Sequence, residues 1–320
     1  MFIESLAPPK FLSRIHSMIK LTNAQIEAIK EDFLSVASLD NPSHHEDLVI
    51  QWVHDFLEEH NLGKAEVDNE KNMLLRVEGE GEWLLLNAHT DGVDISVGKE
   101  PWFDGEFFRT NGKTILGADD LAGVVPILHT VKILKEQQIN HRPLEILLVS
   151  REEISGEGIK AFDKTVLKSK EGLLPDFVGP IGCVGIKAPS KHVITIQVHG
   201  KPAHVKEIQE GVSAIKIMSE FLHTLPIGYI GEDMTLNIGY INGGNGLNIV
   251  PDFVEAKGEL RGFDETACQT ILNLVNQNIK SWQVNHPDAK LEFTSKKVRT
   301  AYEHDTNQPI FSKLEQVTHE

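Results

Sequence analysis

Several features are scarce or missing in this 320-residue sequence, and their absence excludes several classes of protein. Cys183 and Cys268 are the only cysteines and form no C-x-x-C pair, so the sequence predicts neither a disulfide framework nor a thiolate zinc site. No apolar run approaches membrane-spanning length, and no dinucleotide glycine fingerprint follows a predicted strand. We therefore expect neither a membrane protein nor a dinucleotide-dependent redox enzyme.

Basic residues are also in the minority. The 31 Lys and Arg face 47 Asp and Glu, which gives a net charge of -16. A nucleic-acid-binding surface would be basic, so we expect no nucleic-acid partner. Met1–Lys20 contains basic residues, Glu4 and two prolines but no continuous apolar core, and it is therefore a poor secretory signal. These features predict a cytoplasmic protein.

The first predicted elements are two helices. Thr22–Ser38 has apolar residues at the spacing of an amphipathic helix, and Asp40-Asn41-Pro42 then breaks the pattern. Ser43 and Glu46 have the spacing of a capping box, which predicts that a second helix begins there.

A short apolar run, Trp83–Ala88, stops abruptly at His89-Thr90-Asp91. This run predicts a strand buried on both faces, and in open α/β sheets the chemistry collects at the carboxyl ends of strands. Residues i and i+2 of an extended chain point the same way, so Asp91 is placed to orient the ring of His89. The simpler alternative is a polar loop after a strand.

Two further segments carry paired acids. Asp119 and Asp120 open a predicted helix, and Glu152 and Glu153 follow the predicted strand Leu144–Val149. Each pair alone would also suit the electrostatics of a helix start. Carboxylates gathered in one crevice repel one another unless protons or cations neutralise them. One imidazole with several carboxylates suits a hydrolytic zinc, cobalt or manganese site.

These motifs resemble the M20 metallopeptidase family, and within it the peptidase T-like aminotripeptidases. The matching segments cover most of the chain in the order and spacing of the family. They are His89-Thr90-Asp91, Gly117-Ala118-Asp119-Asp120-x-Ala122-Gly123, Glu152-Glu153-x-x-Gly156, Asp176-x-x-Gly179-Pro180-Ile181-Gly182, Pro202-Ala203-His204 and Asn248-Ile249-Val250-Pro251.

The resemblance implies a centre of two zinc ions, with cobalt or manganese as alternatives. His89, Asp119 and Asp176 would bind one ion. Asp119, as a bridging ligand, and Glu153 would bind the other. Nothing in the local sequence around Asp176 marks it as a ligand; without the resemblance it reads as a loop residue.

The resemblance also implies catalytic roles, with a short peptide as the substrate. Asp91 would orient His89. Glu152 would be the general base that takes a proton from a metal-bridging water and later gives it to the leaving amine. The family further implies a cis peptide between Asp119 and Asp120.

From Lys191 onward the pattern changes to a β-α-β-β-α-β order, which predicts a ferredoxin-like unit. Its predicted elements are His192–Val198, Val212–Leu222, Met234–Ile241, Phe253–Leu260, Glu265–Trp282 and Lys290–Phe293. We expect an α/β fold: a zinc-peptidase-like catalytic domain with a mixed sheet covered by helices, plus this inserted α+β lid. The expected boundaries are 1–190 for the first part of the catalytic domain, 191–298 for the lid and 299–320 for the return. In the family the lid often also forms a homodimer.

Three lid residues match positions that reach the substrate in the family: His204, Asn248 and Arg261. His204 would stabilise the tetrahedral oxyanion, in some members from the neighbouring subunit, and Arg261 would bind a carboxylate. Judged by their residues alone, His204 is a loop histidine and Arg261 a surface charge at a strand edge.

Two departures from the family pattern bear on activity. Leu121 stands where many relatives have lysine, at a position that is not a ligand. The sequence re-enters the catalytic domain near Tyr302 and stops at Glu320, before the distal histidine that completes the second metal site in the family. We therefore expect weak occupancy of the second site and impaired hydrolysis. The alternatives are an M20-type deacylase or carboxypeptidase, or a truncated non-catalytic binding protein on the same scaffold.

Overall fold

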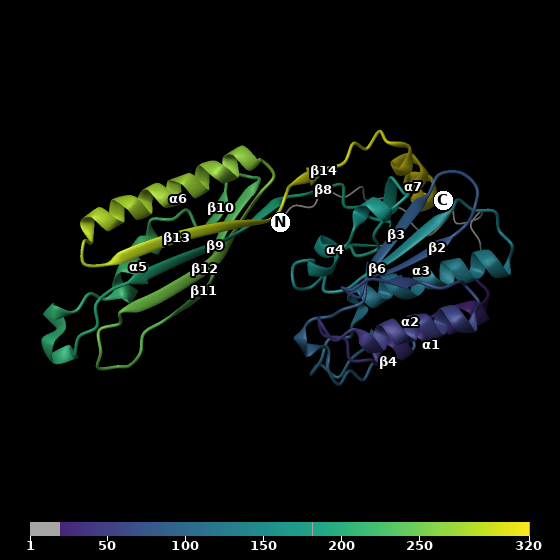
Figure 1. The fold of residues 1–320 in the computed structure, drawn as a ribbon, viewed down its shortest axis with the longest axis horizontal. Helices are drawn as coiled ribbons and strands as arrows, with labels where there is room; N and C mark the ends of the chain where they lie inside the picture. The colour runs from purple at the N-terminus through teal and green to yellow at the C-terminus, as the bar shows by residue number, and fades with distance from the viewer. Residues whose placement is uncertain (1–19, 181, 320) are drawn as a thin grey trace. The chain divides into compact units, whose positions relative to one another are not determined.

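The computed structural model describes residues 20–180 and 182–319, drawn in colour in Figure 1. The prediction about a secretory signal concerns residues 1–19, which lie outside the described residues. The chain divides into two compact units. The catalytic unit is residues 20–180 with 312–319, and the lid unit is Gly182–Phe311. None of the helices in the described part combines the length and apolar character that a membrane span needs.

A five-stranded mixed sheet forms the centre of the catalytic unit. Its strands, in spatial order, are β1 (Glu66–Val67), β2 (Met73–Val77), β6 (Leu144–Val149), β3 (Leu84–His89) and β7 (Glu171–Leu173). β3 is parallel to both β6 and β7, whereas β2 is antiparallel to β6. His89 pairs with Val149 in the ladder, so β3 and β6 end side by side. The mixed α/β sheet is as predicted.

Helices and loops cover both faces of this sheet (Figure 1). α1 (Asn23–Ala37), α2 (Asp47–Glu59) and α3 (Ala118–Glu136) share one large apolar core with the strands. A smaller core lies on the face of α4 (Glu157–Ala161). All six residues of β6 are buried, but the first four of β3 are only half-buried. The predicted complete burial of β3 is therefore wrong, because both cores cover it only in part: Leu84 and Leu86 are half-buried against the large core and Leu85 against the smaller one.

The start of the second helix also differs from the prediction. α2 begins at Asp47, and its N-cap residue Glu46 makes no capping hydrogen bond with its side chain. The hydroxyl of Ser43 instead donates to Asp91 Oδ2 at 2.7 Å. The predicted capping box is wrong because the hydroxyl of Ser43 faces the end of β3. The structure has a capping box at Thr22, where α1 begins.

The first residues of α3 are not regular helix. Asp119 and Asp120 have non-helical backbone angles, and the peptide bond between them is cis, as the family resemblance implies. Leu121 is fully buried in the large core. The two carboxylates therefore stand on an irregular turn that is anchored by a buried side chain.

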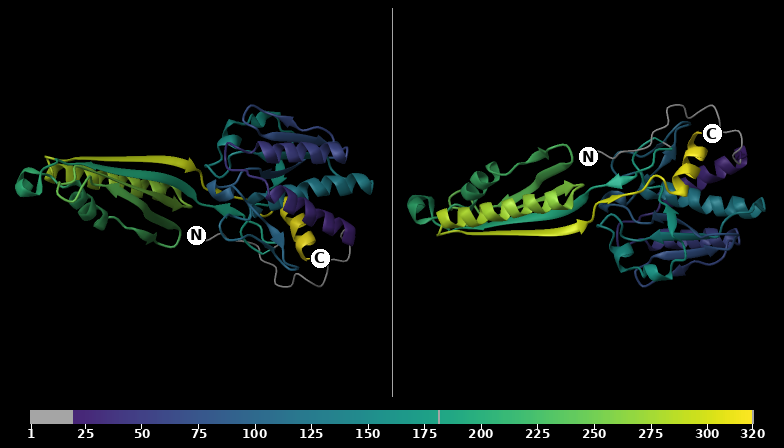
Figure 2. Two further views of the ribbon diagram at one scale, coloured as in Figure 1. Left: turned by 90° about the horizontal axis from the view of Figure 1, so that it is seen from below. Right: turned by 90° about the horizontal axis from the view of Figure 1, so that it is seen from above.

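The lid unit contains a second five-stranded sheet, with helices α5 (Ala214–His223) and α6 (Glu265–Asn285) sharing one core with it (Figures 1 and 2). Its strands, in spatial order, are β10 (Gly228–Ile230), β11 (Met234–Gly243), β12 (Phe253–Gly262), β9 (Ser190–His199) and β13 (Lys290–Arg299). All neighbours are antiparallel. The ferredoxin-like order is as predicted, with β10 as an additional edge strand.

The remaining elements are short apart from the last helix. They are β4 (Trp102–Phe103), β5 (Phe108–Arg109), β8 (Lys187–Ala188), β14 (Tyr302–Glu303) and α7 (Pro309–His319).

Candidate metal centre

Three parallel strands of the catalytic unit end at one edge of its sheet and place the candidate site there. β3 ends at His89, Glu152 and Glu153 follow β6, and Asp176 follows β7. The irregular start of α3 adds Asp119. Potential ligand atoms of His89, Asp119 and Glu153 lie within 4.8 Å of one another.

Asp176 is not one of the residues whose ligand atoms lie within 4.8 Å of one another. It faces the group electrostatically, because burial and the neighbouring charge of Asp119 raise the pKa of Asp176. The sequence around Asp176 does not mark it as a ligand, because β7 is only three residues long and shows no readable periodicity. The pairing of β7 with β3, which could have identified it, is a tertiary contact.

His89 is held in a geometry suited to metal binding. Its Nδ1 lies 2.9 Å from the Asp91 carbonyl oxygen and 3.4 Å from Asp91 Oδ1. Nδ1 is therefore the protonated nitrogen, and Nε2 faces Asp119 Oδ1 at 3.0 Å. Burial lowers the pKa of His89, but the hydrogen bond and charge of Asp91, with the charge of Asp120, outweigh it and raise the pKa to about 10. A bound metal would displace the extra proton.

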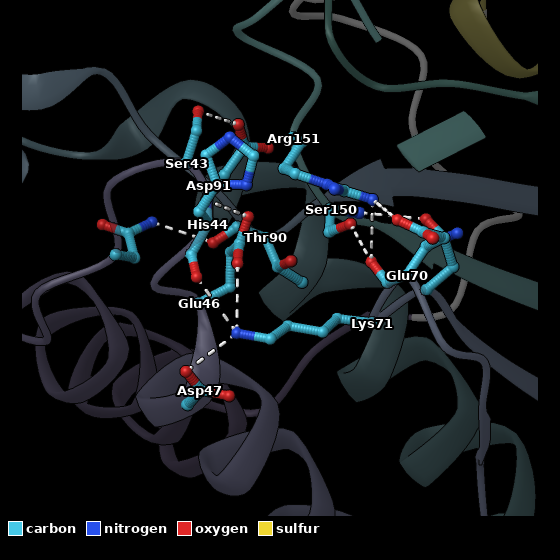
Figure 3. Close-up of polar contacts among 12 residues, drawn as sticks. Ser43, His44, Glu46, Asp47, Glu70, Lys71, Thr90, Asp91, Ser150 and Arg151 are labelled. Carbon is cyan, nitrogen blue, oxygen red and sulfur yellow. Dashed lines mark hydrogen bonds and ion pairs between the residues drawn. The ribbon is translucent and has the colours of Figure 1, made fainter. Parts of the chain in front are cut away.

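The carboxylate of Asp91 connects the strand ends. Its Oδ1 accepts the backbone N–H of Glu152 at 2.8 Å. Its Oδ2 accepts the N–H of Glu153 at 3.2 Å. The same oxygen accepts the hydroxyl of Ser43 at 2.7 Å (Figure 3). Burial raises the pKa of Asp91, but these bonds and His89 outweigh it and keep the pKa below its ordinary value. Asp91 is therefore an ionised anchor for both neighbouring segments.

The segment that carries the paired glutamates is fixed on its other side as well. The hydroxyl of Ser150 donates to the Glu70 carbonyl oxygen at 2.5 Å, and Arg151 forms an ion pair with the Glu70 carboxylate (Figure 3). The backbone between β6 and α4 is thus held from two directions.

The carboxylates of Glu152, Glu153 and Asp176 repel one another and are partly buried. Burial raises the pKa of Glu152, Glu153 and Asp176, and the neighbouring negative charges raise each pKa further. A divalent cation would relieve this repulsion. One imidazole nitrogen with several carboxylate oxygens is a donor set that zinc, cobalt and manganese accept. The residues present therefore fit a divalent metal.

Asp120 has a separate, buried position. Its Oδ2 accepts the backbone N–H of His89 at 3.2 Å. A Cβ atom added at Gly123 would lie 2.3 Å from Asp120 Oδ1, so glycine at this position makes room for the carboxylate. Burial is the main reason why the pKa of Asp120 rises to about 7.

In the lid unit the structure brings His204 and Asn248 together. The backbone N–H of Val205 donates to the Asn248 carbonyl oxygen at 3.1 Å, and both predicted substrate residues are exposed. The N–H of Lys206 donates to His204 Nδ1 at 3.2 Å. The neutral ring of His204 therefore carries its proton on Nε2, which is left as a hydrogen-bond donor.

Arg261 does not join this pair. It lies on β12, where its Nε is 2.7 Å from Glu259 Oε1. Arg261 pairs with Lys191 at one end of the β9–β12 ladder, and Phe253 pairs with His199 at the other. The eight residue steps from 253 to 261 span roughly 26 Å, and His204 lies beyond the far end.

Each unit contains a segment that matches a family profile of peptidases. The family profile of the M20 peptidase dimerisation domain matches residues 192–287, and that of peptidase family M28 matches residues 72–180. The second match spans every candidate residue of the catalytic unit.

Three similar proteins illustrate the range of relatives. The uncharacterized protein YqjE of Bacillus subtilis is 30% identical over 72% of this chain and 65% of its own length. Acetylornithine deacetylase of Vibrio vulnificus is 26% identical over 70% of this chain and 62% of its own length. The crystal structure of a tripeptidase from Staphylococcus aureus superimposes with a TM-score of 0.82 at 25% identity, covering 91% of this chain and 80% of that one. The chain thus spans less than two thirds of the length of these two curated relatives.

Asp120 generates a prediction about pH. Because the folded state raises its pKa from 3.8 to about 7, ionisation favours the unfolded chain as the pH rises through this interval. Asp120→Asn removes this titration and keeps an acceptor for the His89 N–H. In chelator-treated protein, we expect the free energy of unfolding of the wild type to fall relative to that of the variant between about pH 4 and pH 7. Urea unfolding at several pH values measures the difference; a difference independent of pH would contradict the assignment.

Proposed function

We propose that this chain hydrolyses an amide bond of short peptides. The premise is that it belongs to the M20 metallopeptidase family and is peptidase T-like. The observation that carries the proposal is the convergence of potential ligand atoms of His89, Asp119 and Glu153 within 4.8 Å. Asp176 is added on the family resemblance and on the charge of Asp119, which raises the pKa of Asp176. In this proposal His89, Asp119 and Asp176 would hold one zinc ion, and Asp119 and Glu153 would hold a second. Cobalt and manganese are alternatives with the same donor preference.

Glu152 is the general base of the proposed reaction. Its backbone is held by Asp91 beside the cluster, and its raised pKa brings the carboxylate nearer to the working range of an acid–base catalyst. When bound, the metal ions would polarise the scissile carbonyl and acidify the attacking water. Glu152 takes the proton from that water and then donates it to the leaving amine. Asp91 keeps the imidazole of His89 oriented throughout.

The lid supplies the groups that recognise the substrate. The Nε2 proton of His204 is available for an oxyanion, Asn248 lies beside it, and Arg261 would bind the carboxylate of the peptide. A tripeptide spans only about 10 Å, much less than the distance between His204 and Arg261 in one lid. Both can contact one substrate only if they come from two copies of the chain. This separation supports a homodimer formed through the lid, in keeping with the dimerisation-domain match.

A deacylase is the second candidate, favoured by the match to acetylornithine deacetylase. Its substrate would be an N-acyl amino acid, whose carboxylate Arg261 could bind equally well. The same cluster and the same base would serve both reactions, because both cleave an amide.

Replacing the proposed base separates an enzyme from a non-catalytic metal-binding protein. Glu152→Gln keeps the size of the side chain but cannot accept the proton, so we expect turnover of a tripeptide to fall by about 10²–10⁴-fold. Zinc content should stay unchanged, because Glu152 is not a proposed ligand. Steady-state kinetics and metal analysis of the same preparation provide both readouts.

Glu157→Gln is the matched control, since Glu157 is an exposed glutamate at the start of α4. It should behave as wild type. Equal turnover of Glu152→Gln and Glu157→Gln would remove Glu152 from the mechanism.

A substrate panel separates the two enzymatic candidates. We expect tripeptides with a free amino terminus to be cleaved with higher kcat/KM than N-acetylated amino acids, because the proposed substrate is a short peptide. Release of free amino groups, followed by chromatography, measures both reactions. Cleavage restricted to acylated substrates would replace the peptidase assignment with the deacylase.

A further inference from the structure

The loop between α1 and α2 runs beside the end of β3. Pro42 forms a parallel bridge with Gly92. The N–H of Gly92 donates to the Asn41 carbonyl oxygen at 2.8 Å, and the N–H of Ser43 donates to the Gly92 carbonyl oxygen at 3.1 Å. Residues Asn41-Pro42-Ser43, here termed the latch, therefore follow the backbone that leaves the metal cluster.

The hydroxyl of Ser43 reaches the carboxylate that organises the cluster. It donates to Asp91 Oδ2 at 2.7 Å, and Asp91 is fully buried (Figure 3). Without this hydroxyl, Oδ2 would keep only the longer bond from the Glu153 N–H, at 3.2 Å. Rotation of the Asp91 carboxylate would then move Oδ1, which lies 3.4 Å from His89 Nδ1 and accepts the Glu152 N–H at 2.8 Å. Ser43 thus positions the carboxylate of Asp91, which in turn lies against the proposed ligand His89.

The latch is itself anchored by the side chain of Asn41. Asn41 is fully buried; its Nδ2 donates to the Thr90 carbonyl oxygen at 2.9 Å, and its Oδ1 accepts Lys99 Nζ at 2.5 Å. A Cβ atom added at Gly117 would lie 2.9 Å from Lys99 Nζ. The same lysine therefore packs against the turn that leads to Asp119. The latch connects the His89 end of β3 with the start of α3.

We propose that Ser43 is a positioning residue of the metal centre. Its hydroxyl holds the Asp91 carboxylate in the orientation that places Oδ1 3.4 Å from His89 Nδ1 and lets the carboxylate accept the backbone N–H groups of Glu152 and Glu153. The inference rests on the proposed function only in that the cluster binds a divalent cation. Loss of a group that contacts a metal ligand directly weakens metal affinity by about 10–100-fold in other proteins. Asp91 is such a group here, and Ser43 acts one hydrogen bond further away, through Asp91.

The test is zinc affinity of the full chain, measured by competition with a chromophoric chelator. Ser43→Thr and Ser43→Val have the same shape and differ in a hydroxyl, so they separate the hydrogen bond from packing. We expect zinc binding that is weaker by up to about 10-fold for Ser43→Val than for Ser43→Thr, and the same loss in Ser43→Ala relative to wild type, because Ser43 acts on the ligand through Asp91. Ser38→Ala, which removes a hydroxyl that bonds only within the end of α1, should bind zinc as wild type does.

Equal zinc affinity of Ser43→Thr and Ser43→Val would overturn the positioning role and leave the proposed function intact. Absence of zinc binding by the folded wild type would instead overturn the metal centre itself. Thermal unfolding with excess chelator provides the remaining control: a purely structural hydroxyl would lower the stability of Ser43→Val without changing its zinc affinity.

Discussion

The carboxylate of Asp91 is the interaction on which the candidate site depends. It is fully buried, yet the pKa of Asp91 stays low because a serine hydroxyl and two backbone amides donate to it and the ring of His89 pairs with it at 3.4 Å. These partners come from the α1–α2 loop, from the segment after β6 and from the end of β3. One ionised group thus holds three separate parts of the chain against one another. The side chains proposed as metal ligands would therefore be held in place before a metal binds.

Much of this arrangement could be predicted from the sequence, because its signals are local. The apolar run before His89 and the buried strand before Glu152 and Glu153 mark two strand ends, and strand ends of a parallel pair meet at one edge. The periodicities after residue 190 likewise predict the ferredoxin-like order of the lid, because each of its long elements carries its own pattern.

The rest could not be predicted because it depends on tertiary contacts. Ser43 and Glu46 have the spacing of a capping box, but the proximity of Asp91 redirects the serine hydroxyl. Asp176 follows a strand of three residues, too short for any periodicity, so only the family resemblance suggests it and no local pattern does. The pairing of that strand with β3 is a tertiary contact. The separation of His204 from Arg261 follows from the register of β9 and β12, which no local pattern encodes.

The central claim is that the clustered side chains bind a divalent cation. A crystal structure of the chain grown with zinc, with anomalous data collected at the zinc edge, tests it most directly. The account predicts an anomalous peak bonded to His89 Nε2 and to carboxylate oxygens of Asp119 and Asp176, with any second peak between Asp119 and Glu153. Zinc bound elsewhere, with these four side chains pointing to separate surfaces, would contradict it.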